Sequence, residues 1–200
     1  MKLSNVLWLA LVAVALWSGW RRLELRPVHP PDGVLAPGEP RQSELQDAAP
    51  LSRGRWLLTP RAQYDITARI LAREDYYFDG LADLVPEDLA LGWGPMSDNV
   101  VLTHFDISQA ARFYFWHSRG PLVISREAIT SHSANTHLIP ANDAVRAALR
   151  RLRIGQVVRL SGELVDGKRA DGAWLKTSLT RVDSGPGSCE VLLVESVAVQ

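Results

Sequence analysis

The segment 131–137 holds the residue types that could most directly do chemistry. It places two imidazoles five residues apart among hydroxyl and amide side chains. Imidazole is the commonest metal ligand, and it carries protons near neutral pH. In an irregular loop the two histidines could converge on one ion, with another histidine or a carboxylate as the third ligand. The candidate polar site consists of His104, Asp106, His132, Asn135 and His137.

The spacing of these groups matches none of the strong metal signatures. The sequence has no HExxH pattern and no cysteine cluster, because Cys189 is its only cysteine. Small polar side chains also satisfy backbone groups in irregular turns. The sequence therefore favours a hydrogen-bonded structural loop over a metal or catalytic site, and it predicts no bound metal or cofactor.

Nucleophilic catalysis has three candidate residues and no supporting motif. Ser131, Ser133 and Cys189 are the candidates, but the GxSxG elbow of many hydrolases is absent. Pro186, shortly before the cysteine, removes one backbone donor from the turn. We expect the cysteine to be a buried, inert thiol, and an enzymatic role is disfavoured.

Anion binding has a candidate in the arginine-rich segment 143–153. Glycine loops of the GxxxxGK[ST] and GxGxxG types are absent. The arginines could contact phosphates or anionic lipid head groups, although such residues are more often a solvated helix face. The candidate anion contacts are Arg146, Arg150, Arg151 and Arg153.

The aromatic residues favour core packing over ligand stacking. The run RFYFW at 112–116 is a dense β-forming segment. In such a strand Phe113 and Phe115 face one side, and Tyr114 and Trp116 face the other. Trp93, between two glycines, is the aromatic residue most expected to lie exposed.

Hydrophobic periodicity predicts short strands and one amphipathic helix. Alternation of apolar and polar residues indicates strands at 64–70 and 156–165, and further strands are expected at 55–58, 121–125, 173–182 and 189–199. Asn142 can cap a helix from 143 to about 153, and a second short helix is possible at 86–91. Gly162 suggests a bulge or sharp bend. The predicted fold is a β-rich α+β domain, either a small curled sheet or an OB-like barrel.

The N-terminal segment indicates a membrane anchor. Residues 3–20 carry no charge, and a helix of that length spans roughly 27 Å, close to a bilayer core of about 30 Å. A cleaved signal peptide is the alternative. The proline-rich segment 23–52 is expected to be a linker with a reach on the order of 70 Å, or else an ordered arm along the domain. We therefore predict an anchor at 1–22, a linker at 23–52 and a globular domain at 53–200.

Four sequence segments carry a resemblance that spans most of residues 55–200. These are WGPMSD, ISQAARFYFW, HSANTHLIPA and LTRVDSGPGSCEV. Together they resemble an uncharacterised family of bacterial proteins with an N-terminal membrane anchor and one exported domain. The resemblance implies a single-pass protein of the bacterial inner membrane with its domain in the periplasm, or a secreted protein if the signal is cleaved. It implies no catalytic or ligand residues.

Composition and motifs together favour a binding protein over an enzyme. The formal net charge is zero, whereas a dedicated nucleic-acid binder usually has a strong basic excess. We expect a membrane-anchored, non-enzymatic binding or scaffolding module of the cell envelope, with a protein partner there and no nucleic acid. The alternatives are a histidine-dependent hydrolase, with or without a metal, and an OB-like module that binds nucleic acid or glycan.

Overall fold

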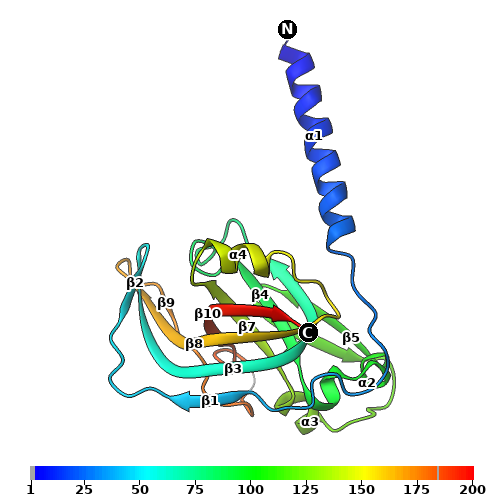
Figure 1. Cartoon of the computed structure of the whole chain (residues 1–200), viewed down its shortest axis with the longest axis vertical. Coiled ribbons are helices and arrows are strands. Elements are labelled where there is room, and N and C mark those ends of the chain that lie inside the picture. Colours follow the sequence, from blue (N-terminus) through cyan, green and yellow to red (C-terminus); the bar gives the residue numbers. More distant parts are fainter. Residues whose placement is uncertain (1–2, 184) are drawn as a thin grey trace.

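The computed structural model describes residues 3–183 and 185–200 (Figure 1). Met1 and Lys2, which begin the predicted anchor, and Ser184 lie outside the described residues. Helix α1 (Leu3–Glu24) projects away from a strand-rich body. Among the described residues, no helix is both long enough and apolar enough to cross a membrane.

A strongly curled sheet forms the body. Its strand order is β1-β3-β4-β7-β10-β8-β9, with β2 beside β3, and β3 also pairs with β8. Of the two expected forms, the curled sheet is confirmed. The strands are β1 (Arg41–Glu44), β2 (Leu51–Arg53), β3 (Trp56–Asp75), β4 (Glu87–Gly92), β7 (Ser133–Pro140), β8 (Val157–Arg169), β9 (Trp174–Leu175) and β10 (Glu190–Val199).

The long strand β3 is what curls the sheet. Its first part pairs with β8 from Trp56 to Arg69, and its last part pairs with β4 from Arg69 to Asp75. The segments at 55–58 and 64–70 are therefore parts of one strand. Its inner face buries Tyr64, Ile66 and Ile70 in the main core. Strand β10 lies between β7 and β8, which confirms the central strand expected at 189–199.

A two-stranded hairpin is inserted between β4 and β7. Strands β5 (Phe105–Ala110) and β6 (Phe113–Ser118) form it, and Phe105 and Trp116 pack edge to face at 5.8 Å. The expected alternation in β6 is confirmed, because Tyr114 and Trp116 are packed inward while Phe113 and Phe115 are exposed. The short helical elements η1 (Gly94–Ser97), α2 (Asn99–Leu102) and α3 (Arg126–Ser131) flank this hairpin.

Helix α4 (Asp143–Leu149) is the expected amphipathic helix, although it ends earlier than predicted. The Asn142 side chain accepts a hydrogen bond from the Val145 N–H, so the predicted cap is confirmed. Val145, Leu149 and Leu152 pack against the main core.

Two expected elements are wrong, and a third is much shorter than expected. Residues 86–91 are not a helix but belong to the buried strand β4, because their acidic side chains find partners distant in sequence. Residues 121–125 are not a strand. Of the strand expected at 173–182, only Trp174–Leu175 pairs, with β8.

The proline-rich segment is the ordered arm, not a free spacer. Val28 donates its N–H to the Ile154 carbonyl, and Gly94 donates to the Ala36 carbonyl. Strands β1 and β2 then pair with β3. Only about four residues separate the end of α1 from the first of these contacts, a reach of roughly 14 Å. The expected reach on the order of 70 Å is therefore wrong.

The bend predicted at Gly162 lies where β8 meets a bulge in β10. The register shifts between Val194 and Ser196, and a Cβ on Gly162 would lie 1.9 Å from the Leu193 carbonyl oxygen. The strands can approach this closely only because the residue has no side chain.

We expect Gly162→Ala to lower the free energy of unfolding by at least about 2 kcal/mol, since backbone must move to admit the methyl group. Chemical denaturation of the full chain in mild detergent measures this. The matched control is Gly120→Ala, because a Cβ there meets no atom within 4 Å. Equal stability of the two variants would contradict the close approach.

Candidate active-site cleft

The sheet register brings a carboxylate, an imidazole and a thiol onto one face. Asp88 of β4 lies opposite His137 of β7, and His137 lies beside Val191 of β10. Cys189 is two residues before Val191, so it lies on the same face of the sheet. Asn135, two residues before His137, completes the row. Three neighbouring strands therefore position four polar side chains.

His137 and Asp88 form a buried ion pair. The distance from His137 Nδ1 to Asp88 Oδ1 is 2.9 Å, and the side chains are 9% and 0% exposed. Burial alone lowers the pKa of His137, but contacts with Asp88 and Cys189 outweigh it and raise the pKa to about 9. The imidazole is therefore positively charged at neutral pH.

Arg112 supplies a second positive charge to Asp88 from the hairpin turn. Its guanidinium lies 3.4 Å from Asp88 Oδ1 and forms a fork with Asp79, at 2.7 and 2.8 Å. This fork holds the pKa of Asp79 below its usual range. The guanidinium also lies over the Tyr76 ring, 4.0 Å from its centroid. Two cations and two carboxylates thus balance in this cluster.

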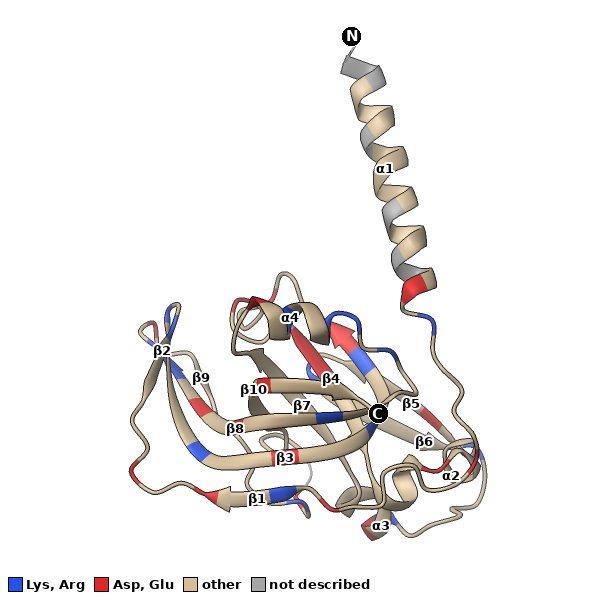
Figure 2. Cartoon of the chain, viewed as in Figure 1, with Lys and Arg blue, Asp and Glu red and all other residues tan. Residues whose placement is uncertain are grey.

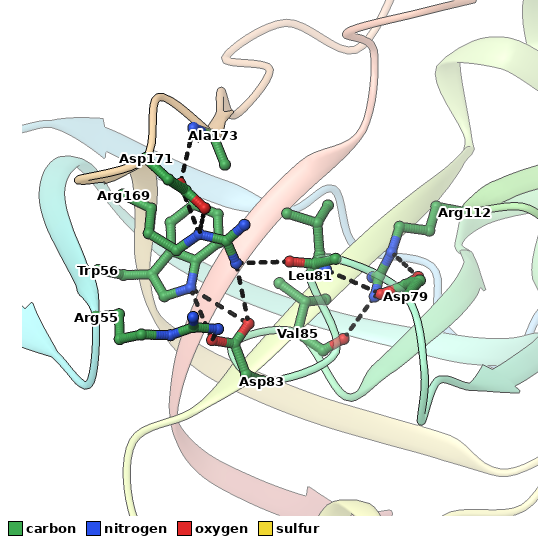
Figure 3. A network of polar contacts seen from close by, with 11 residues as sticks. Arg55, Trp56, Asp79, Leu81, Asp83, Val85, Arg112, Arg169, Asp171 and Ala173 are labelled. Atoms are coloured by element: carbon green, nitrogen blue, oxygen red, sulfur yellow. Dashed lines mark hydrogen bonds and ion pairs between the residues drawn. The ribbon is translucent and has the colours of Figure 1, made fainter.

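The loop between β3 and β4 is fastened at both sides (Figure 3). On one side Arg112 binds Asp79 and the Val85 carbonyl. On the other side Asp83 receives hydrogen bonds from Arg55 and Trp56, close to Arg169. These contacts fix the loop, so Asp79 is held in position to pair with Arg112.

The thiol borders a cleft of about 240 Å³. Cys189 is buried, and its sulfur accepts a hydrogen bond from Asn135 Nδ2 at 3.6 Å. Asn135 is itself held, because Nδ2 also donates to the Arg112 carbonyl and Oδ1 accepts from Gln109. One wall of the cleft is aromatic, and the other is the segment before β10. The lining includes Trp93, Phe113, Tyr114, Phe115, Trp116, Arg181, Asp183, Cys189 and Glu190.

Glu190 is a buried carboxyl on the opposite face of β10. It is 4% exposed, and within residues 3–183 and 185–200 its Oε2 has no hydrogen-bond partner. Burial raises its pKa to about 8, with the neighbouring Asp183 adding to the rise. Glu190 is therefore largely protonated at neutral pH.

The candidate polar site divides between separate neighbourhoods. Asn135 lines the cleft, and His137 follows two residues later on the same face of β7. His132 lies elsewhere, with Nδ1 2.8 Å from the Ala128 carbonyl and Nε2 3.3 Å from Glu39. The reason is that 133–140 is a strand and not a loop. His132 caps the end of α3 just before this strand begins, so it does not share the strand face of His137.

His104 and Asp106 also lie apart from the cleft. Both are exposed, and Asp106 pairs with Arg119 at 2.6 Å. Within residues 3–183 and 185–200, no group of three or more His, Cys, Asp or Glu side chains could hold a metal ion. The expected convergence of His132 and His137 on one ion, with a third ligand from His104 or Asp106, is wrong.

Trp93 is not the exposed aromatic residue that the sequence suggested. It is fully buried, and its Nε1 donates to Glu39 Oε2 at 2.9 Å. Glu39 belongs to the ordered arm and contacts both Trp93 and His132. His132 therefore sits at an anchoring point of the arm.

Three of the four candidate anion contacts gather on α4 and just beyond it. Arg146, Arg150 and Arg151 line a shallow hollow together with Glu24 and Asp143. Arg153 is not part of that lining; it is half-buried, and its backbone N–H donates to Gln156. The hollow is close to the end of α1.

Sequence reasoning missed Asp88 and Arg112 as members of the site. Asp88 was assigned to a helix, and Arg112 was only the first letter of an aromatic run. An ionisable residue inside an otherwise apolar segment was the signal that could have found Asp88, because such a residue is buried only when it is paired.

Comparison with known proteins gives no match, whether with protein-family models, curated proteins or solved structures. The resemblance to a family of anchored bacterial proteins stays a prediction. The geometry defines a class of site: a cleft lined by a thiol, with a buried imidazole–carboxylate pair close to it in the sheet.

Because the carboxyl of Glu190 is buried, we expect the free energy of unfolding to fall as the pH rises. The unfolded chain loses the Glu190 proton near pH 4.5, whereas the folded chain keeps it until about pH 8, so stability declines between these values. His137 adds a further decline between about pH 6.5 and 9. We expect Glu190→Gln to match the wild type near pH 4.5 and to exceed its stability by a few kcal/mol, roughly, at pH 8.

Denaturation of the full chain in mild detergent at several pH values measures this difference. The control is Glu195→Gln, an exposed position on the same strand. A wild type and a Glu190→Gln variant whose curves run parallel from pH 4.5 to 8 would contradict the buried protonated carboxyl.

Proposed function

We propose that the protein is a membrane-tethered binding module of the bacterial envelope, whose cleft takes an extended peptide segment of a partner protein. The observation that carries this proposal is the free edge of β6. Residues 113–116 of this strand all line the cleft. Because successive residues of a strand point to opposite faces, the cleft must border the edge of β6 and not only one of its faces. Within the described part of the chain, β6 pairs with β5 only.

An extended peptide suits this edge. An unpaired strand edge offers backbone donors and acceptors to an added strand, and neighbouring pockets accept alternate side chains. Phe113 and Phe115 are 38% and 51% exposed, so apolar side chains of a partner would gain contact area there. The cavity of about 240 Å³ is below the range of about 300–1,000 Å³ that encloses small-molecule ligands.

The plan of the body supports an OB-like module. The order β3-β4-β7-β10-β8, the parallel pairing of β7 with β10 and the helix between β7 and β8 suit such a partly open barrel. Ligands of OB-folds bind over the second and third strands, which here are β4 and β7. The inserted hairpin covers this face, and only the cleft beside it is open.

The charges favour a peptide over nucleic acid. Asp183 and Glu190 line the cleft with Arg181, so basic residues are not in excess there. Figure 2 shows Lys and Arg interspersed with Asp and Glu over the body. A nucleic-acid surface concentrates Lys and Arg on one face.

We assign the membrane tether to α1, and the arginines on and just after α4 are a second observation in favour of membrane attachment. The described side chains of α1 before its last turn are uncharged and mostly exposed (Figure 2). Leu7, Trp8 and Leu16 are each more than half exposed, which suits insertion into lipid. Helix α4 lies on the side of the body towards α1, where its arginines would meet anionic head groups (Figure 1).

We expect alkaline phosphatase fused after Gln200 to be active in bacterial cells, because the domain is exported. The control is Leu11→Arg, since an arginine in a membrane span costs about 2.5–3.5 kcal/mol; it should reduce membrane recovery and phosphatase activity. An inactive phosphatase fusion, together with a fluorescent green fluorescent protein fusion at the same position, would contradict export.

We expect a photo-crosslinking amino acid at Phe115 to capture a partner in intact cells. The same group at Phe78, which is fully exposed on another loop, is the control. Mass spectrometry should map the adduct to one extended apolar segment of one envelope protein. A synthetic peptide of that segment should then slow hydrogen exchange of the β6 amides in the full chain. Equal adducts at both positions, or unprotected β6 amides, would contradict peptide binding.

A further inference from the structure

The thiol at the floor of the cleft has a polar surrounding that an inert core cysteine does not need. Its sulfur accepts from Asn135 Nδ2 at 3.6 Å, and the Arg112 carbonyl lies 3.9 Å away. His137 lies on the adjacent strand β7, on the same face of the sheet as Cys189. Cys189 also lines the cleft, so a ligand there reaches the sulfur.

One buried polar atom near the thiol has unused hydrogen-bonding capacity. Within the residues that the structure describes, Asp88 Oδ2 has no hydrogen-bond partner, whereas His137 Nδ1 lies 2.9 Å from Asp88 Oδ1. His137 is 7% exposed and Asp88 is fully buried. Such an atom is costly to leave unpaired, and its position near a nucleophile points to a role in chemistry.

The order of these groups is that of an activated nucleophile. A thiol lies on the same face as an imidazole of the adjacent strand, and a carboxylate pairs with that imidazole at 2.9 Å. Asp88 and His137 come from neighbouring strands and Cys189 comes directly before β10, so the sheet register holds their spacing. The amide of Asn135 adds an N–H donor at the sulfur, where negative charge would develop.

We propose that Cys189 is the nucleophile of an acyl-transfer site, with His137 as its acid–base partner and Asp88 as a positioning residue. The substrate class is a thioester or activated ester whose acyl group is apolar or aromatic. Phe113 and Phe115 provide the wall against which such a group would pack. This inference does not depend on peptide binding along β6.

The reaction balances with water as the co-reactant. In the reactive form the thiol proton already lies on His137, so an imidazolium stands beside a thiolate. The sulfur attacks the acyl carbon to form a carbon–sulfur bond. The bond to the leaving group then breaks, and the leaving group takes the proton from His137. Water next attacks the thioester and gives a proton to His137. The carboxylic acid departs, and the thiolate and the imidazolium are restored.

The test uses p-nitrophenyl acetate and the full chain in mild detergent. Because the chain has one cysteine, an acetyl thioester forms at one position, and intact-mass measurement follows it. We expect the folded chain to be acetylated at least tenfold faster than the same chain in urea. A thiol that is only buried, and not activated, would be acetylated more slowly in the folded chain than in urea. Folded acetylation no faster than unfolded acetylation overturns the proposal, and this comparison needs no variant.

Variants then assign the roles. Cys189→Ser should lose the thioester adduct, and His137→Gln should slow acetylation at least tenfold. The matched control is His132→Gln, in the same sequence segment but a separate neighbourhood, which should react like the wild type. Asp88→Asn should shift the pH profile of acetylation to lower pH, since the carboxylate that holds the imidazolium is gone. A folded His137→Gln variant that reacts as fast as the wild type overturns the proposal.

Discussion

The fully buried carboxylate of Asp88 is the constraint on which the surrounding structure depends. An ionised carboxylate without solvent is tolerated only when positive charge and hydrogen bonds surround it. His137 provides one positive charge from the adjacent strand, and Arg112 provides the other from the hairpin turn. Arg112 in turn requires Asp79 of the β3–β4 loop. One buried charge therefore specifies how a strand, a hairpin and a loop meet.

The same constraint explains why the cleft lies where it does. The hairpin must bring Arg112 over β4 and β7, and its second strand then runs beside the start of β10. The space left between them contains Cys189 at its floor and an aromatic wall on one side. The fold and the proposed chemistry thus use the same groups, because the imidazole that pairs with Asp88 lies on the same face of the sheet as the thiol.

Local patterns in the sequence predicted the parts of the fold that local physics determines. Alternation identified most of β3 and β8, the Asn142 cap identified α4, and Gly162 identified the bend. The failures have one cause. Strands β4 and β7 carry polar residues whose partners lie far away in the chain, so their sequences resemble a helix start and a loop. The sequence named His137 as a candidate, but its position beside Asp88 and Cys189 depends on strand register, which no short segment contains.

The two-residue turn of the hairpin, Ala111 and Arg112, adopts φ values of 50° and 65°, a left-handed conformation that side chains other than glycine disfavour. The turn is therefore held in place by what Arg112 touches and not by its own preference. The β5–β6 hairpin thus acts as a covalently attached ligand on the face of β4 and β7 that it covers. Any external molecule that seeks the same face competes with a segment already present at an effective concentration on the order of millimolar, and only a tight binder would displace it.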